Sequence, residues 1–358
     1  MILVAPTAFK GTIPAGEAAA ALAAGARVAC PGAEVRELPV SDGGPGLIDA
    51  LRAARGGELR FARVRDPLGR PVDARILLLE LEGGPAAVLE SADACGIHLL
   101  ARAELDPLRL GTGGVGELIA AASGLADTVV AGLGGSATVD GGAGMASALG
   151  WRFLDDAGRQ LPAGGAALAR LVRLEPPPGR AASEVIALAD VRNPLLGALG
   201  AAAVFAPQKG ARPDQVPLLE RGLARLADVV ARDGGPELRA LPGAGAAGGL
   251  GAACVAFLDA TLERGAEWVL RAVDFDALLA RARLVITGEG SYDAQSSMGK
   301  VTGEIVARAG RAGVPVLLVA GRVRTSIPPH VTVAPPALDV LDAAALRSMA
   351  AAGTKPIA

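Results

Sequence analysis

The sequence predicts an α/β protein with a parallel, doubly wound sheet that is assembled from both ends of the chain. Short apolar runs that suit buried strands alternate with longer segments of helical periodicity near both termini. Glycine-rich loops with isolated polar residues follow these strands, as expected at the carboxyl edge of a parallel sheet. With 358 residues, of which 51% are hydrophobic and 20% charged, the chain is long enough for two domains.

Composition argues against several classes of function. A net charge of −2, a pI near 5.9 and 3% aromatic residues do not suit a nucleic-acid-binding surface. No apolar run approaches the roughly 18 to 20 residues that span a bilayer, and no signal peptide is recognisable, so we expect a soluble, cytoplasmic protein that binds no membrane. Three scattered cysteines without a CxxC motif, and His98 and His330 far apart, predict neither disulfides nor a zinc site.

The N-terminal segment predicts two strand-helix pairs. A buried strand at residues 2–5 leads through a loop containing Lys10 into a helix at 15–29, and a strand at 34–40 leads through SDGGPG into a helix at 47–54. Asp42 is the only charge in the second loop. Followed by two glycines it suits an anion- or metal-binding turn, and the alternative is that it caps the next helix.

A β-rich segment of short strands begins near residue 60 and leads to a strand at 128–130. The loop after this strand contains Gly134, Gly135, Ser136 and Asp140, and its glycines let backbone N–H groups approach an anion ahead of a helix that starts near 143. The alternatives are a turn that serves strand-helix packing alone, or a degraded dinucleotide fingerprint in which Asp155 or Asp156 would bind a ribose.

Two later strands also end in polar residues. The strand at 184–188 is followed by Asp190 and Asn193, and Gln208 and Lys209 come shortly afterwards; this set suits a polyanion with a magnesium ion. The strand at 284–287 enters a glycine loop ahead of a helix that starts near 301. This loop region contains Glu289, Asp293, Gln295 and Lys300.

This combination of residues predicts phosphoryl transfer. Anion-binding loops, carboxylates and only four lysines in an arginine-rich chain occur without a plausible catalytic cysteine or histidine. The sequence has neither a Walker A motif nor a GxSxG nucleophile elbow. The non-enzyme alternative is a ligand-binding protein of the same fold.

Six motifs in order resemble the bacterial glycerate kinase family, whose members include enzymes of glucarate, galactarate and glyoxylate utilisation. They run from residue 3 to about 321 and read VAPTAFKGTIPA, LPVSDGGPG, GLGGSATVDGGAGMASALG, ADVRNPLLG with VFAPQKGA, PGAGAAGGLGAA, and ITGEGSYDAQSSMGK. The resemblance implies an ATP- and Mg²⁺-dependent kinase that phosphorylates glycerate, commonly at the 2-hydroxyl. It also implies a Rossmann-like domain at residues 1–62 plus 283–358 and an inserted α/β domain at 63–282, and it leaves the oligomeric state open, a homodimer included.

The chain departs from the family pattern at several loop positions. The family usually has Asp-Ser at Thr7 and Ala8, Glu at Pro45, Asn at Val139, Cys at Ala189 and Arg at Ser291. A carboxylate acceptor would use such an arginine as a bidentate partner. A kinase for another small hydroxy acid, or a weakly active paralogue, is therefore the alternative to a glycerate kinase.

We expect the following roles. Asp293 orients or deprotonates the acceptor hydroxyl, and Lys10 and Lys300 meet phosphate or the acceptor carboxylate; a loop cap and solvated surface lysines are the alternatives. Asp42 and Asp190 are the carboxylates for Mg²⁺. The remaining candidates bind substrate or phosphate: Gly134, Gly135, Ser136, Asp140, Asn193, Gln208, Lys209, Glu289 and Gln295.

Overall fold

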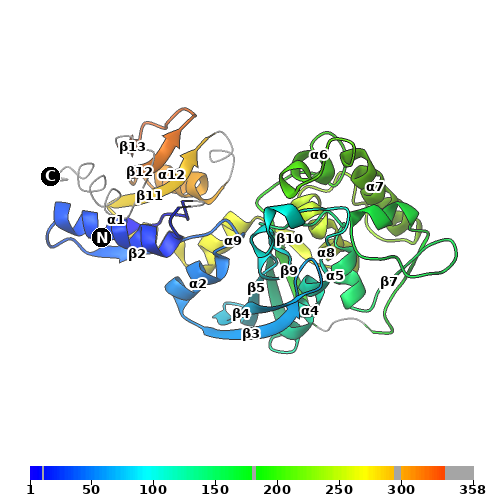
Figure 1. Cartoon of the computed structure of the whole chain (residues 1–358). Coiled ribbons are helices and arrows are strands. Elements are labelled where there is room, and N and C mark those ends of the chain that lie inside the picture. Colours follow the sequence, from blue (N-terminus) through cyan, green and yellow to red (C-terminus); the bar gives the residue numbers. More distant parts are fainter. Residues whose placement is uncertain (10–11, 180–182, 294–299, 335–358) are drawn as a thin grey trace. The chain divides into compact units, whose positions relative to one another are not determined.

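The chain forms two compact units, and the first is built from both ends of the chain. Unit 1 comprises Met1–Gly56 and Gly265–Ala358, and unit 2 comprises Gly57–Arg264. The structure is a computed structural model that describes residues 1–9, 12–179, 183–293 and 300–334. Figure 1 shows the blue N-terminal and orange C-terminal segments together in unit 1. The predicted α/β fold class is confirmed.

Unit 1 contains a five-stranded parallel sheet with the order β13-β12-β11-β1-β2. Leu3 in β1 pairs with Val285 of β11 on one side and Arg36 of β2 on the other, which joins the two chain ends. All three residues of β1 are buried, as a strand covered on both faces requires. The elements of unit 1 are β1 (Ile2–Val4), α1 (Ala15–Ala29), β2 (Val35–Glu37), α2 (Leu47–Arg55), α9 (Gly265–Ala272), α10 (Phe275–Leu279), β11 (Leu284–Tyr292), α12 (Val301–Arg311), β12 (Val316–Val323) and β13 (Val331–Val333).

Helix α1 occupies the predicted residues and covers this sheet with an apolar stripe. Ala18, Leu22 and Ala26 recur at helical spacing and are fully buried. They belong to one core cluster with Val4 of β1 and Ile286 of β11. The helix is therefore part of the core of unit 1.

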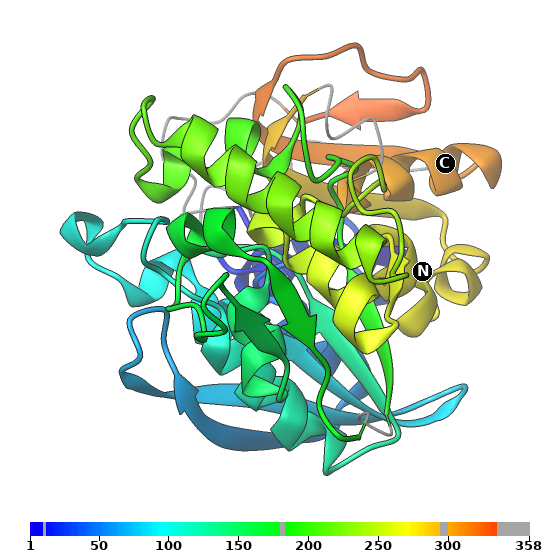
Figure 2. The same cartoon turned by 90° about the vertical axis from the view of Figure 1, so that its right-hand side faces the viewer.

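Unit 2 contains a six-stranded mixed sheet with the order β10-β9-β6-β5-β4-β3. The pairs from β10 to β5 are parallel, and those of β5 with β4 and β4 with β3 are antiparallel. Figure 2 shows the long strands β3 and β4, in blue, at one edge of this sheet. The sheet strands are β3 (Glu58–Arg65), β4 (Pro71–Leu81), β5 (Gly84–Glu90), β6 (Thr128–Gly132), β9 (Glu184–Leu188) and β10 (Thr261–Glu263), and β7 (Arg152–Leu154) pairs with β8 (Arg173–Glu175) as a separate ribbon.

The helices of unit 2 supply the rest of its core. In α7, Leu219, Leu223, Leu226 and Val230 recur at helical spacing and are buried, so this stripe of the helix is core. The helices are α3 (Ala92–Cys95), α4 (Gly113–Ser123), α5 (Ala143–Ala148), α6 (Ala201–Phe205), α7 (Val216–Arg232) and α8 (Leu250–Leu258), with 3₁₀ turns η1 (Ile97–Leu99), η2 (Arg102–Glu104), η3 (Gly165–Arg170), η4 (Pro207–Lys209) and η5 (Ala246–Gly248). Within the described ranges, no helix is both long and apolar enough to cross a bilayer.

The boundaries between the units differ from the expected 62/63 and 282/283. Strand β3 begins at Glu58 and pairs along its length with β4, so the first boundary falls at the two glycines before it. Helices α9 and α10 precede β11 and belong to unit 1, where α9 packs against α12 and α2. The second boundary therefore lies at the start of α9.

Candidate active site

A cavity of about 1140 Å³ in unit 1 lies at the carboxyl edge of its parallel sheet. Loops that follow β1 and β2, the ends of β11 and β12, and the first turns of α1, α2 and α12 provide its walls. This is the edge at which open α/β sheets bind ligands. The polar side chains of the lining are Thr7, Thr12, Glu17, Ser41, Asp42, Asp49, Glu289, Ser291, Asp293, Lys300, Thr302, Arg322 and Arg324.

Strand β11 and the residue directly after it bring three of these side chains onto one face. Glu289, Ser291 and Asp293 are spaced two residues apart and all line the cavity, whereas Tyr292 between them is buried. Burial, together with the negative charge of Glu289, raises the pKa of the Tyr292 phenol. Alternation along an extended backbone thus explains why Glu289 and Asp293 share a cavity.

The strand prediction for this segment was too short. The sequence predicts a strand that ends at Thr287, but β11 runs to Tyr292 because its pairing with β12 continues to Tyr292 and Val323. Gly288 makes that close pairing possible, since a Cβ atom there would lie 2.3 Å from the carbonyl oxygen of Val319. Glu289 is therefore a strand residue and not a loop residue.

Lys300 stands immediately before α12 and also lines the cavity. Its position adds an ammonium group to the N-terminus of an 11-residue helix, where unpaired N–H groups and the helix dipole favour anions. Lys10 and Gln295 lie outside the described residues. Of the three predicted catalytic side chains, Asp293 and Lys300 therefore share this cavity.

Asp42 lines the same cavity from the loop after β2. Its Oδ1 accepts a hydrogen bond from the Gly44 backbone N–H at 3.2 Å, and the hydroxyl of Ser41 accepts one from Gly43 at 3.2 Å. The N-cap of α2 is Gly46, with φ of 94°, and it makes no side-chain capping bond. The alternative interpretation of Asp42 as the helix cap is therefore wrong.

The glycine loop of unit 2 is organised by Asp140, which is almost completely buried. Its Oδ2 accepts hydrogen bonds from the Thr112 backbone N–H (2.9 Å), the Thr112 hydroxyl (2.8 Å) and the Gly144 N–H (3.1 Å), while Oδ1 accepts one from Gly142 (3.1 Å). Thr112 is the N-cap of α4 and Gly142 the N-cap of α5. The anion at these helix termini is thus the protein's own carboxylate, so the N–H groups of Gly142 and Gly144 are already used.

Lys209 supports the same loop from η4. The side chain is buried, and Nζ donates hydrogen bonds to the Ser136 hydroxyl and the Thr138 carbonyl oxygen, both at 2.8 Å. Burial lowers the pKa of Lys209 to about 8, against the opposing attraction of Asp140. These contacts connect η4 to the segment after β6.

Gly134 and Gly135 remain accessible in this loop. Within the described part of the chain, their backbone N–H groups donate no hydrogen bond.

The dinucleotide alternative finds no support in the surroundings of Asp155. This carboxylate accepts hydrogen bonds from the Ala157 and Arg159 backbone N–H groups at 3.0 and 2.9 Å and so holds its own turn.

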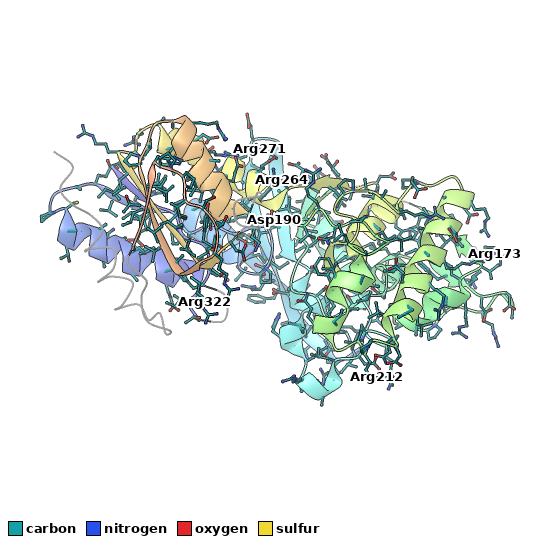
Figure 3. All side chains as sticks on the ribbon, turned by 90° about the horizontal axis from the view of Figure 1, so that it is seen from above. Arg173, Asp190, Arg212, Arg264, Arg271 and Arg322 are labelled. Carbon is teal, nitrogen blue, oxygen red and sulfur yellow. The ribbon has the colours of Figure 1, made fainter. Side chains whose placement is uncertain are left out.

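The remaining unit 2 candidates have different surroundings. Asp190, labelled in Figure 3, follows β9 and is partly buried, and Gln208 is exposed. The Asn193 side-chain amide donates to the Leu199 carbonyl oxygen at 2.7 Å and so holds its own loop. Asp42 belongs to unit 1 and Asp190 to unit 2. Among the residues that the structure describes, no group of three or more His, Cys, Asp or Glu side chains could hold a metal ion.

The departures from the family pattern fall into two groups. Thr7, Ala8, Pro45 and Ser291 all line the unit 1 cavity. Val139 is fully buried in the unit 2 core, as is most of Ala189. The missing asparagine at position 139 is thus replaced by a core residue.

Sequence reasoning missed two cationic residues of the cavity, Arg322 and Arg324. They follow the apolar part of β12 at the same edge of the sheet as Asp293. The other candidates were found because polar residues at the carboxyl ends of parallel strands tend to bind ligands. The same rule, applied to the end of β12, identifies these two arginines.

Known proteins match this chain over nearly its whole length. The family model described as "Glycerate kinase family" matches residues 2–333. A Bacillus subtilis protein named glycerate kinase is 42% identical over 326 residues, covering 90% of this chain and 85% of that protein, and an Escherichia coli protein named glycerate 2-kinase is 40% identical over 326 residues, covering 89% and 84%. The crystal structure of a putative glycerate kinase 2 from Salmonella typhimurium superposes with a TM-score of 0.83 at 36% identity and covers 98% of this chain and 96% of that one. The chain belongs to the glycerate kinase family.

Proposed function

We propose that this protein is a kinase that transfers the γ-phosphoryl group of ATP to glycerate, at its 2-hydroxyl, in a magnesium-dependent reaction in the cytoplasm. The observation that carries the proposal is that Asp293, Lys300 and Asp42 line one cavity at the carboxyl edge of a parallel sheet. Membership of the glycerate kinase family supports the same acceptor.

Asp293 is the group that we assign to the acceptor hydroxyl. Its carboxylate accepts the hydroxyl proton while the acceptor oxygen forms a bond to the γ-phosphorus and the bond from that phosphorus to the ADP oxygen breaks. The products are the phosphorylated acid and ADP, and the proton is released from Asp293 to solvent afterwards. An Asp293→Asn variant should lose at least about 10²-fold in kcat, since an amide cannot accept this proton.

Lys300 is the cation that we assign to the charge on the transferring group. Its place before α12 adds a point charge to backbone N–H groups that already favour anions. We keep Lys10 and Gln295 as further contacts to phosphate or acceptor.

Asp42 is the carboxylate of the unit 1 cavity that we assign to Mg²⁺, and we keep Glu289 as a contact to substrate or phosphate. Mg²⁺ is typically held by one or two carboxylates together with substrate phosphates, and carboxylates on the unit 1 cavity wall fit that requirement. Bound there, the ion would neutralise phosphate charge. We keep Asp190, in unit 2, as a proposed carboxylate ligand of Mg²⁺.

Gly134, Gly135 and Ser136 are the unit 2 residues that we assign to phosphate. Support comes from the accessible N–H groups of the two glycines and from the bonds by which Lys209 and Asp140 fix the loop. We therefore assign Asp140, Lys209 and Asn193 to holding these loops, and we keep Gln208 as a ligand contact.

The proposal is tested by measuring ADP release from ATP·Mg with D-glycerate, L-glycerate and a panel of other small hydroxy acids. We expect turnover with D-glycerate that depends on Mg²⁺. Release with another hydroxy acid but not with glycerate would refute the acceptor and keep the kinase. The panel of other acids is included because the family pattern is altered in the lining at Thr7, Ala8, Pro45 and Ser291. Nucleotide binding without turnover for any acceptor would favour a ligand-binding protein.

A further inference from the structure

Arg322 lies beside the proposed catalytic strand on the same face of the unit 1 sheet. In the parallel pairing of β11 with β12, Arg322 is the register partner of Ser291, and both residues line the cavity. Register partners of parallel strands lie about 5 Å apart and point to the same face. Arg322 therefore shares its face with Glu289 and Asp293, while its strand neighbour Val323 pairs with the buried Tyr292.

The guanidinium of Arg322 is available to a ligand. The residue is exposed, and within the part of the chain that the structure describes its side chain makes no hydrogen bond or ion pair. Figure 3 labels Arg322 at this end of β12. Arg308 of α12 differs, because it bonds to Glu304 at 2.9 Å and to Asp276 at 2.8 Å.

The charges of the cavity explain why an acidic acceptor needs such a group. Five carboxylate side chains line the cavity and would repel the carboxylate of the acceptor: Glu17, Asp42, Asp49, Glu289 and Asp293. The described cations of the lining are Lys300, Arg322 and Arg324. An arginine offers a planar pair of N–H donors that matches a carboxylate, which the single ammonium of Lys300 does not.

We infer that Arg322 is the residue that binds the carboxylate of the acceptor and so makes the site specific for a small hydroxy acid. This inference rests on the proposed kinase function and names the anchor within the same cavity. Where the family usually has arginine, this chain has Ser291, and the register partner of that serine is Arg322. The small serine side chain leaves space for the guanidinium of its neighbour. The anchor on β12 and the proposed base directly after β11 line the same cavity, as binding of one small hydroxy acid requires.

The first test compares single variants of the full chain. Arg322→Gln should raise KM for D-glycerate about 10- to 100-fold, the loss typical of a charged hydrogen-bonded pair, and leave KM for ATP within about 2-fold. Glyceramide, which lacks the charge, should be turned over equally by wild type and variant. Arg311→Gln, on an exposed residue at the end of α12, is the matched control and should change neither constant. Since Arg322 is exposed, thermal unfolding should be unchanged.

A swap variant supplies the second test. Ser291→Arg combined with Arg322→Ser moves the guanidinium across one strand pair, and it should recover a KM within about 10-fold of wild type, whereas Arg322→Ser alone should not. Arg324→Gln should have the smaller effect, since Arg324 lies beyond the end of β12. An unchanged KM in Arg322→Gln, or a larger loss in Arg324→Gln, would overturn the inference.

Calorimetric titration with D-glycerate separates this inference from the proposed function. Wild-type protein that binds glycerate without turnover, together with weaker binding by Arg322→Gln, would refute the kinase and retain the anchor. Turnover by wild type with unchanged constants in the variant would refute the anchor alone. Failure of wild-type protein to bind glycerate would refute both.

Discussion

Asp140 offers a test of how the unit 2 loop is held in place. Its Oδ2 accepts three of the four hydrogen bonds to the carboxylate and Oδ1 accepts the fourth, at the N-termini of α4 and α5. An Asp140→Asn variant keeps the volume but removes the charge and replaces one oxygen with an NH₂ group. If the amide oxygen takes the Oδ2 position, the NH₂ group faces the Gly142 N–H, and two donors then oppose each other.

The size of the effect follows from these contacts. A buried N–H without an acceptor costs about 1–3 kcal/mol, and losing a negative charge at two helix N-termini costs about 0.3–1 kcal/mol for each. We therefore expect Asp140→Asn to lower the free energy of unfolding of unit 2 by about 2–5 kcal/mol. Asp73→Asn is the control: it breaks an exposed pair with Arg63, which contributes about 0–1 kcal/mol.

Urea unfolding followed by tryptophan fluorescence measures this difference. The chain has two tryptophans, Trp151 in unit 2 and Trp268 in unit 1, so a Trp268→Phe background leaves a reporter in unit 2 alone. Trp151 is partly buried, makes an edge-on contact with Phe257 of α8, and should lose this environment when unit 2 unfolds. A loss below about 0.5 kcal/mol, or no larger than that of Asp73→Asn, would refute the account of the loop.

Three further predictions concern both units. Burial lowers the Lys209 pKa from 10.5 to about 8, so the folded protein binds fewer protons than the unfolded chain between these pH values. Stability relative to Lys209→Met should therefore increase from pH 8 to 10.5 by up to about 3 kcal/mol; equal pH dependence of the two urea midpoints would contradict this. Asp293→Asn should lower kcat at least about 10²-fold with KM for ATP unchanged, and near-normal turnover would remove Asp293 as the base. Gly288→Ala should lower the thermal midpoint because its Cβ would meet the Val319 carbonyl oxygen, whereas Gly16→Ala in α1, with open space around it, should not; equal midpoints would contradict the packing.

Much of the fold could be predicted from local patterns. Helix α1 and strand β9 have the predicted bounds, because apolar periodicity and proline or glycine punctuation act locally there. The extension of β11 to Tyr292 could not, since it depends on pairing with β12, which is distant in sequence. The unit boundary before α9 likewise depends on what that helix packs against.

The candidate site could likewise be predicted only in part. Strand ends predicted Asp42, Glu289, Asp293 and Lys300, and these four line one cavity. A sequence cannot tell whether a polar side chain meets a ligand or its own backbone, and Asp140 meets backbone. Glycines and acids in one loop suggest an anion site in either case.

Phosphorus NMR of the reaction of wild-type protein with ATP·Mg and D-glycerate tests the central claim most directly. Transfer to the 2-hydroxyl predicts a new phosphomonoester resonance split into a doublet by the single hydrogen on C2. A triplet, from the two hydrogens on C3, would contradict the assigned hydroxyl. No phosphomonoester at all would contradict the proposal that this chain is a glycerate kinase.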